Sequence, residues 1–258
     1  MDIGGIITAA LVVGVIGLII GVLLGIAGSV FAVTIDEKEV QIRKCLPGNN
    51  CGGCGYPGCD GLAHAIFTGE AEANACPVGG AEVAKQIGNV LGVDVKPAEQ
   101  RKAFVQCKGS FDNATLNEHG HKICAYGCTG CKACMEACKF DAIHVVDGLA
   151  VVDEEKCVGC GKCQAACVRH VIAMVPKFAG HMVACSNPEK GKAAKAVCRN
   201  ACISCGMCVK VCLAEAISIE SGVARIDENK CTGCGACADA CPVHVIHKDS
   251  FICDNCLK

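Results

Sequence analysis

The chain has 258 residues, a formal net charge of −2 at pH 7 and 52% hydrophobic residues. This hydrophobic content excludes an intrinsically disordered chain, and the lack of a basic excess argues against a nucleic-acid-binding protein. Cysteine occurs 27 times, whereas tryptophan is absent and aromatic residues make up only 3%. A core this poor in aromatic side chains must be filled by small aliphatic residues and cysteine, or by a group that is not protein.

The N-terminal segment predicts a membrane anchor. Residues 6–33 carry no charge, and as a helix of about 42 Å they exceed a hydrocarbon core of about 30 Å. A cleaved signal peptide is the alternative, but the apolar run is too long and no positive charge precedes it. We therefore expect a transmembrane anchor at residues 1–35. Basic residues follow it, so the positive-inside rule predicts a single-pass protein of the cell membrane with cytoplasmic soluble domains; these residues are Lys38, Arg43 and Lys44.

Glycines recur along this predicted anchor. Gly17, Gly21 and Gly25 are spaced four residues apart and therefore share one face of a helix. In lipid, small residues at this spacing let a second helix approach closely, although glycine is also common in membrane helices generally. The pattern favours packing against a membrane partner.

Four later segments share the spacing C-x2-C-x2-C-x3-C. Disulfides are disfavoured in the cytoplasm, so dense cysteine there indicates metal or redox chemistry. In this spacing the first three thiolates bind one [4Fe–4S] cluster and the fourth binds the other cluster of a pair. We expect that fourth cysteine at the start of a helix. Zinc needs only four thiolates per ion and does not explain the third and fourth members.

An internal repeat predicts how these cysteines pair. The first two runs recur 74 residues later, and each pair of runs encloses a predicted hairpin, at residues 142–152 and 216–226. Each pair therefore forms one two-cluster ferredoxin module, whose runs exchange their fourth ligands. The expected ligand sets are Cys128, Cys131, Cys134 with Cys167; Cys157, Cys160, Cys163 with Cys138; Cys202, Cys205, Cys208 with Cys241; and Cys231, Cys234, Cys237 with Cys212.

A fifth cysteine group precedes the modules and has a different spacing. Cys51, Cys54, Cys59 and Cys76 form C-x2-C-x4-C-x16-C, with a predicted helix at residues 61–69 between the last two. The many glycines around Cys51 and Cys54 allow tight backbone turns around a cluster. A zinc site is the alternative, but the glycines and the neighbouring ferredoxin modules favour a [4Fe–4S] cluster.

The order of these parts resembles that of the B subunits of Rnf complexes, with an N-terminal membrane helix, the segment Leu46-Pro47-Gly48-Asn49-Asn50-Cys51 and then ferredoxin pairs. The resemblance covers essentially the whole chain. It implies an electron-transfer subunit of an ion-translocating ferredoxin:NAD oxidoreductase, without a substrate-converting site of its own. Soluble ferredoxin would donate the electrons, and other Rnf-type membrane and flavin- or NAD-binding subunits would receive them.

The predicted architecture is therefore an α+β chain with five [4Fe–4S] clusters. Its parts are the anchor (1–35), a four-cysteine [4Fe–4S] domain (36–97), two tandem bacterial-type ferredoxin modules (98–176 and 177–248) and a C-terminal tail with CxxC (249–258). A membrane-anchored polyferredoxin serving a hydrogenase or dehydrogenase is an alternative function. A secreted disulfide scaffold is another, which the predicted cytoplasmic location opposes.

Seven cysteines remain outside the five sets: Cys45, Cys107, Cys124, Cys185, Cys198, Cys253 and Cys256. Cys124 and Cys198 are related by the 74-residue repeat, and Cys107 and Cys185 precede them at similar distances. The first module thus has the pair Cys107 and Cys124, and the second has Cys185 and Cys198. We expect each pair to approach the first cluster of its own module, as small buried apolar side chains or as redox thiols. Cys45 has no partner by spacing, and the terminal CxxC supplies only half of a metal site.

Overall fold

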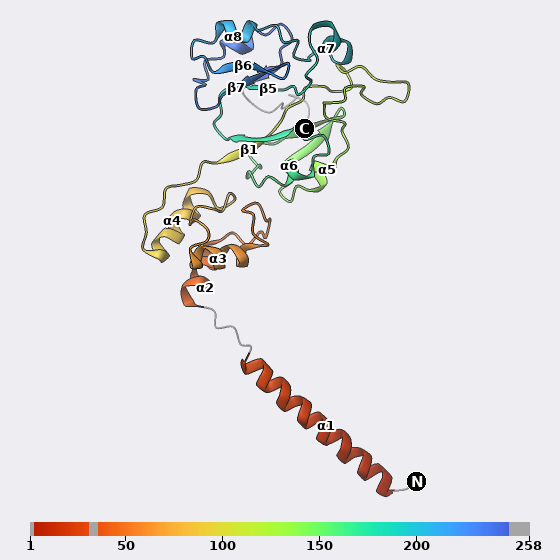
Figure 1. The fold of residues 1–258 in the computed structure, drawn as a ribbon, viewed down its shortest axis with the longest axis vertical. Coiled ribbons are helices and arrows are strands. Elements are labelled where there is room, and N and C mark those ends of the chain that lie inside the picture. Colours follow the sequence, from red (N-terminus) through yellow and green to blue (C-terminus); the bar gives the residue numbers. More distant parts are fainter. Residues whose placement is uncertain (1–2, 31–35, 248–258) are drawn as a thin grey trace.

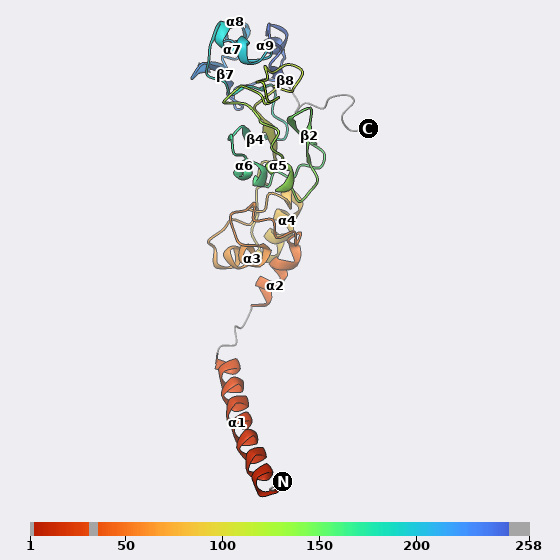
Figure 2. The same cartoon turned by 90° about the vertical axis from the view of Figure 1, so that its right-hand side faces the viewer.

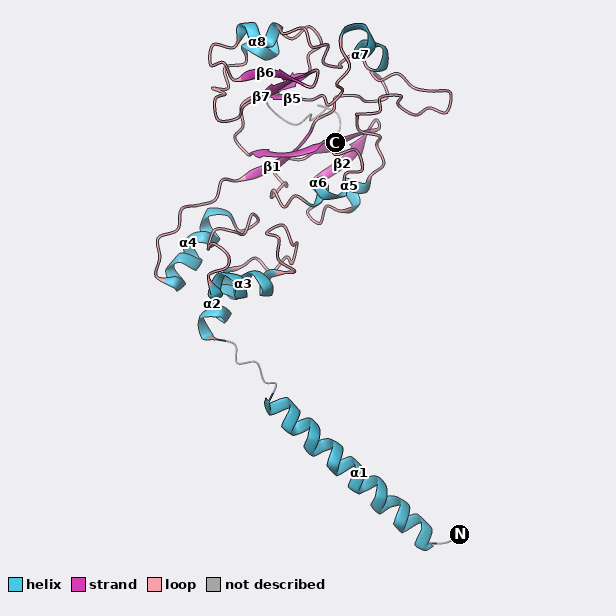
Figure 3. Ribbon diagram, viewed as in Figure 1, coloured by secondary structure: helices cyan, strands magenta, loops and turns pink. Residues whose placement is uncertain are grey.

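The computed structural model describes residues 3–30 and 36–247. Figures 1 and 2 show the same order of parts along the long axis: the helix α1, a small domain that carries α2 to α4, and two stacked units rich in short strands. Coloured by secondary structure in Figure 3, the small domain is helical and the two units are mixed. The C-terminal tail predicted at residues 249–258, with Cys253 and Cys256, lies outside the described residues.

The helix α1 covers Ile3–Val30. An 18-residue window from Leu11 to Gly28 has a mean hydropathy of 2.8, and no part of it is buried against the rest of the chain. The helix is therefore long and apolar enough to cross a membrane. The prediction that the N-terminal segment forms one long apolar helix is confirmed.

Three helices build the small domain: α2 (Glu37–Cys45), α3 (Cys59–Thr68) and α4 (Gly80–Leu91). The Asp36 carboxylate caps α2 by accepting a hydrogen bond from the Lys38 N–H at 2.8 Å. The helices bury Ile42, Leu62 and Ile87, one from each helix, in a common core. The helix predicted at residues 61–69 is confirmed as α3, which starts two residues earlier.

The first of the two predicted ferredoxin modules contains four strands and two short helices: β1 (Arg101–Val105), α5 (Ala133–Glu136), β2 (Ile143–Val146), β3 (Leu149–Val152), α6 (Lys162–Ala166) and β4 (Ile172–Pro176). Antiparallel β1 and β4 pair from Arg101 with Pro176 to Val105 with Ile172. The strands β2 and β3 form the predicted hairpin around a turn at Asp147.

The second module repeats this plan with one additional helix, α7. Its elements are β5 (Met182–Val183), α7 (Gly191–Val197), α8 (Met207–Val211), β6 (Ile217–Glu220), β7 (Val223–Ile226), α9 (Ala236–Asp239) and β8 (Ile246–His247). Antiparallel β5 pairs with β8, and β6 with β7. Phe104 from β1 of the first module is buried in the core of the second. The two modules therefore share a packed interface, and no sheet within the described residues has more than two strands.

Candidate iron–sulfur sites

The four ferredoxin runs share one backbone conformation around their second cysteine. In every run the residues immediately before and after that cysteine have positive φ. Six of these eight residues are glycines, which adopt this conformation without strain, and the exceptions are Lys132 (φ 65°) and Ser204 (φ 56°). Alternation of this kind wraps the chain tightly, so the first three cysteines of a run face a common centre.

A short helix follows the second cysteine of each run. The third cysteine lies inside it, as Cys134 does in α5 and Cys163 in α6. The fourth cysteine comes after the helix rather than at its start, so that expectation is wrong. The helices are only four or five residues long, and Cys138 therefore emerges beyond the end of α5.

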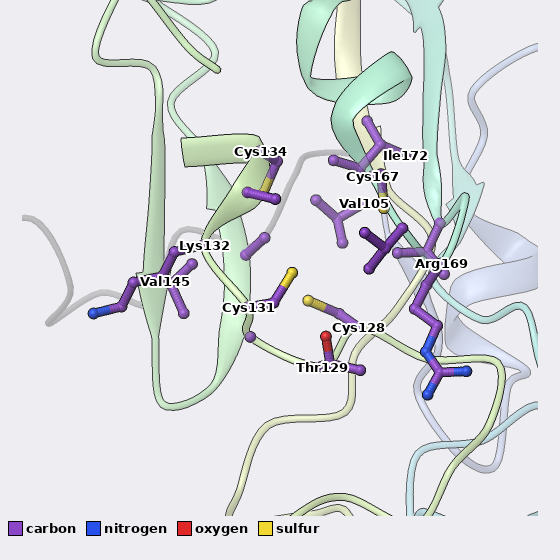
Figure 4. Close-up of a pocket in the computed structure, with 15 residues that line it drawn as sticks. Val105, Cys128, Thr129, Cys131, Lys132, Cys134, Val145, Cys167, Arg169 and Ile172 are labelled. Carbon is purple, nitrogen blue, oxygen red and sulfur yellow. The ribbon is translucent and has the colours of Figure 1, made fainter. Parts of the chain in front are cut away.

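The cysteines of the first predicted set line one cavity, which Figure 4 shows. Cys128, Cys131 and Cys134 from the first run meet Cys167 from the second, among apolar side chains such as Val105 and Ile172. We call this the Cys128 site. It brings together the fourth cysteine of one run and the first three of the other, as the exchange of ligands requires.

Two further sets line cavities in the same way. The Cys157 site consists of Cys157, Cys160, Cys163 and Cys138, and the Cys202 site of Cys202, Cys205, Cys208 and Cys241. In the last set, the Cys231 site, the charges of Cys231 and Cys212 both act on Cys237. The binding of one cluster by the four cysteines of each set stays a prediction.

The first-domain site gathers Cys51, Cys54, Cys59 and Cys76. Cys51, Cys59 and Cys76 are buried, and both Cys54 and Cys59 lie near enough to act electrostatically on Cys76. The Asn50 side chain accepts a hydrogen bond from the Cys59 N–H at 2.8 Å, which fixes the start of α3. The Gly79 N–H donates to Cys76 Sγ at 3.4 Å.

The thiols of these sites need a cation to hold them as thiolates. Burial raises the pKa of Cys134 to about 11, and the nearby Cys128 and Cys167 act in the same direction. Burial likewise raises the pKa of Cys163 to about 12. Cys131 differs, because the N–H of Ala133 lowers its pKa and the side chain is exposed. Binding of iron would therefore displace protons from the buried thiols.

The cysteines of the Cys128, Cys157 and Cys202 sites surround a cavity rather than meet at a single point. Within residues 3–30 and 36–247, no three His, Cys, Asp or Glu side chains come close enough together to hold a single metal ion. A tetrahedral zinc ion needs four ligands at about 2.3 Å, whereas a [4Fe–4S] cluster takes each thiolate on a different iron. Four cysteines around a shared apolar cavity therefore fit the cluster.

Neighbouring sites lie close together. Burial raises the pKa of Cys160 in the Cys157 site, and Cys51 from the first-domain site adds to the increase. Cys134 from the Cys128 site acts in the same way on Cys163. The first-domain, Cys157 and Cys128 sites thus form a continuous row.

Four of the remaining cysteines converge in a way that sequence reasoning missed. Cys107 and Cys185 do approach the first cysteine of their modules, Cys128 and Cys202, as expected. The two pairs also meet one another, because Cys198 lies near both Cys107 and Cys124. Only the packing of one module on the other brings them together. Cys45 stands apart and packs against the core of the small domain.

Known proteins match the chain along most of its length. The family described as "Putative Fe-S cluster" matches residues 46–78, and the "4Fe-4S dicluster domain" family matches residues 127–171 and 201–245. The first of these segments contains the four cysteines of the first-domain site, and the other two contain the four ferredoxin runs.

Three curated relatives carry related names, each that of the B subunit of a complex. The B subunit of the Na(+)-translocating ferredoxin:NAD(+) oxidoreductase complex of Acetobacterium woodii is 42% identical over 84% of this chain and 70% of its own. The B subunit of the ion-translocating oxidoreductase complex of Methanosarcina acetivorans is 40% identical over 83% of this chain and 87% of its own. The B subunit of the proton-translocating ferredoxin:NAD(+) oxidoreductase complex of Clostridium ljungdahlii is 36% identical over 84% of this chain and 82% of its own.

Proposed function

The chain belongs to the B subunits of Rnf-type ion-translocating ferredoxin:NAD+ oxidoreductase complexes, and we propose that it relays electrons from reduced soluble ferredoxin through five [4Fe–4S] clusters. The twenty cysteines of the five sites would be the ligands. The observation that carries this proposal is the convergence of cysteines from two different runs on one cavity, which is seen at the Cys128, Cys157 and Cys202 sites. Clusters of this kind exchange single electrons without a substrate-converting site.

The arrangement of the sites supports a directional role. The second module lies at the end of the molecule remote from α1 in both views (Figures 1 and 2), and two of its predicted ligands are exposed, Cys205 and Cys234, against one in the first module, Cys131. A soluble carrier can approach a cluster that is bound by exposed cysteines, since electron exchange needs proximity but no binding cavity for the carrier. The first-domain site follows α1 in the chain and would deliver electrons to the membrane and flavin- or NAD-binding subunits.

The membrane topology belongs to the same proposal. The helix α1 would cross the membrane once and hold the soluble domains at the cytoplasmic face, where basic residues follow it in the sequence. The coupling ion would be chosen by partner subunits. In support, two relatives with similar B subunits are named for different ions, Na(+) and protons.

Electron uptake by the isolated subunit tests the proposal. The full chain is purified anaerobically in mild detergent and mixed with reduced ferredoxin while its visible sulfur-to-iron absorption is followed. Rapid loss of that absorption, to an extent comparable with the loss caused by dithionite, is the expected result. If dithionite reduces the clusters but reduced ferredoxin does not, the proposed role as ferredoxin acceptor is wrong.

A further inference from the structure

Four cysteines outside the five sites meet at the packed interface between the ferredoxin modules. Two come from each module: Cys107 and Cys124 from the first, Cys185 and Cys198 from the second. Cys107 follows β1, Cys185 follows β5 and Cys198 directly follows α7. Cys185 and Cys198 are buried, and the other two are partly buried. We call this group the junction site.

Two glycines show how closely the thiols approach. A Cβ placed on Gly109 would lie 3.5 Å from Cys107 Sγ and 3.7 Å from Cys198 Sγ, so these sulfurs face the same small space. A Cβ on Gly127 would lie 3.2 Å from Cys107 Sγ and 3.4 Å from Cys124 Sγ. The glycines thus leave room between thiols where any other residue would place a carbon atom. Cys185 lies at the other side of the group, where its Sγ accepts a hydrogen bond from the Cys202 N–H at 3.4 Å, and it is near enough to Cys124 for the two to interact electrostatically.

Hydrogen bonds between the modules fix the backbone on both sides of the junction site. The Ser186 hydroxyl donates to the Gln106 carbonyl at 2.9 Å, beside Cys185 and Cys107. The Thr115 N–H donates to the Val197 carbonyl at 3.0 Å, next to Cys198. The four thiols are therefore held by contacts that link the modules, rather than by either module alone.

The junction site follows the internal repeat. Cys124 and Cys198 are 74 positions apart. Cys107 comes two residues after Val105, which pairs with Ile172, and Cys185 comes two residues after Val183, which pairs with Ile246. Since Ile172 and Ile246 are also 74 positions apart, Cys107 and Cys185 occupy equivalent positions. Each copy of the module thus contributes the same two thiols.

The surroundings of the thiols resemble those of the predicted ligands. The Gly109 N–H donates to Cys107 Sγ at 3.3 Å and the Cys202 N–H to Cys185 Sγ at 3.4 Å. The Ala142 N–H donates to Cys138 Sγ in the same way, at 3.4 Å. The Lys122 ammonium, held 2.7 Å from the Gly109 carbonyl, adds a positive charge beside the group. These donors and this charge act against burial, which is the larger effect and raises the pKa of Cys107, Cys185 and Cys198 as it raises that of the predicted ligands Cys134 and Cys163.

We propose that Cys107, Cys124, Cys185 and Cys198 bind a sixth [4Fe–4S] cluster between the two ferredoxin modules. It would stand between the Cys128 site and the Cys202 site, because Cys107 lies beside Cys128 and Cys185 beside Cys202. The sixth cluster would connect the two modules into one row of electron carriers. Its role as a connection rests on the proposed electron relay, whereas its existence is a question of iron content.

Native mass spectrometry of the full chain tests the junction site. Protein produced and purified anaerobically in mild detergent should carry about 24 iron and 24 sulfide ions, against about 20 of each for five four-iron clusters. Cys198→Ser and Cys124→Ser should each lose about four irons and keep the rest. Cys45→Ser is the matched control, because it removes a cysteine outside all six sites and should lose none.

Three results would overturn the proposal: a wild-type mass with five clusters, full iron retention in both variants, or one zinc ion that the variants lose. If a variant loses all its iron through misfolding, the wild-type mass decides alone. A count of five clusters with intact reduction by ferredoxin would remove the sixth cluster and leave the proposed relay standing. A count of six clusters without reduction by ferredoxin would support the sixth cluster and contradict the proposed relay.

Discussion

Gly53 lies directly against the backbone of Cys160. A Cβ placed on Gly53 would be 2.7 Å from the Cys160 carbonyl oxygen and 2.9 Å from its Cα, closer than real Cβ atoms come. Gly53 stands between Cys51 and Cys54 of the first-domain site, and Cys160 is the second cysteine of a ferredoxin run. The absence of a side chain at Gly53 therefore lets two predicted cluster sites from different domains approach each other.

Gly53→Ala should loosen this contact. Overpacking of a close contact costs about 1–3 kcal/mol, and here the small domain can relieve the clash by moving away from the first module. Endoproteinase Glu-C should then cut the exposed connecting segment after Glu99 several-fold faster than in the wild-type protein, with iron content unchanged. Gly61→Ala is the control, since its Cβ would meet only Pro57 and Tyr56 of its own domain. Equal cleavage rates in both variants would show that the contact does not hold the domains together.

Cys138→Ala should empty the Cys157 site and spare the Cys128 site, although Cys138 belongs to the same run as Cys128. The physical reason is that Cys138 lines the cavity formed by the other run. Loss of that cluster, about four irons, would free three thiols for alkylation by iodoacetamide. Peptide mass spectrometry should then find labels on Cys157, Cys160 and Cys163. Labels on Cys128 and Cys131 instead would mean that each run binds its own cluster.

Removal of iron should unfold the ferredoxin modules. Their helices have four to seven residues and their sheets have two strands, too little structure to be stable without further support. Binding of a structural metal contributes about 10–16 kcal/mol in small zinc domains, and clusters should be comparably important here. Circular dichroism of the chelator-treated chain should show no cooperative thermal transition for the soluble part. A cooperative melt with native-like strand signal would contradict this expectation.

The glycine face of α1 should bind a partner helix. A Cβ placed on Gly17, Gly21 or Gly25 would have no atom of another part of the chain within 4 Å, so the face is open. Gly21→Leu would hold two helix backbones apart while remaining compatible with lipid. Co-purification of partner subunits in mild detergent should therefore fall several-fold, with cluster content intact. Val22→Leu, off that face, is the control; equal retention of partners by both variants would leave α1 as a simple tether.

Local sequence signals predicted the elements that form between near neighbours. The β2–β3 hairpin follows from two short, mainly apolar segments on either side of Asp147 and Gly148, a pair that adopts the positive φ such a turn needs. The pairing of β1 with β4 has no local signal, since Arg101 and Pro176 meet only after the whole module has folded. Spacing alone likewise indicated which cysteines share a cavity within a module.

The junction site could not be predicted for a related physical reason. Cys107 and Cys198 belong to different modules, and their approach depends on how the modules pack, with Phe104 buried across the interface. The 74-residue repeat showed that Cys124 and Cys198 are equivalent, but equivalence does not bring two residues together. Lys132 and Ser204 were also unexpected, because a left-handed conformation without glycine leaves no mark in the spacing.

The most direct test of the central claim, that these cysteines carry four-iron clusters, is Mössbauer spectroscopy of the full chain grown with ⁵⁷Fe and purified anaerobically. The account predicts that essentially all bound iron is tetrahedral and sulfur-coordinated, with the spectrum of oxidised [4Fe–4S] clusters and one sulfide per iron. Reduction should convert this spectrum to that of the one-electron-reduced clusters. Isolated ferric or ferrous sites, or a chain that retains its fold with zinc in place of iron, would contradict it.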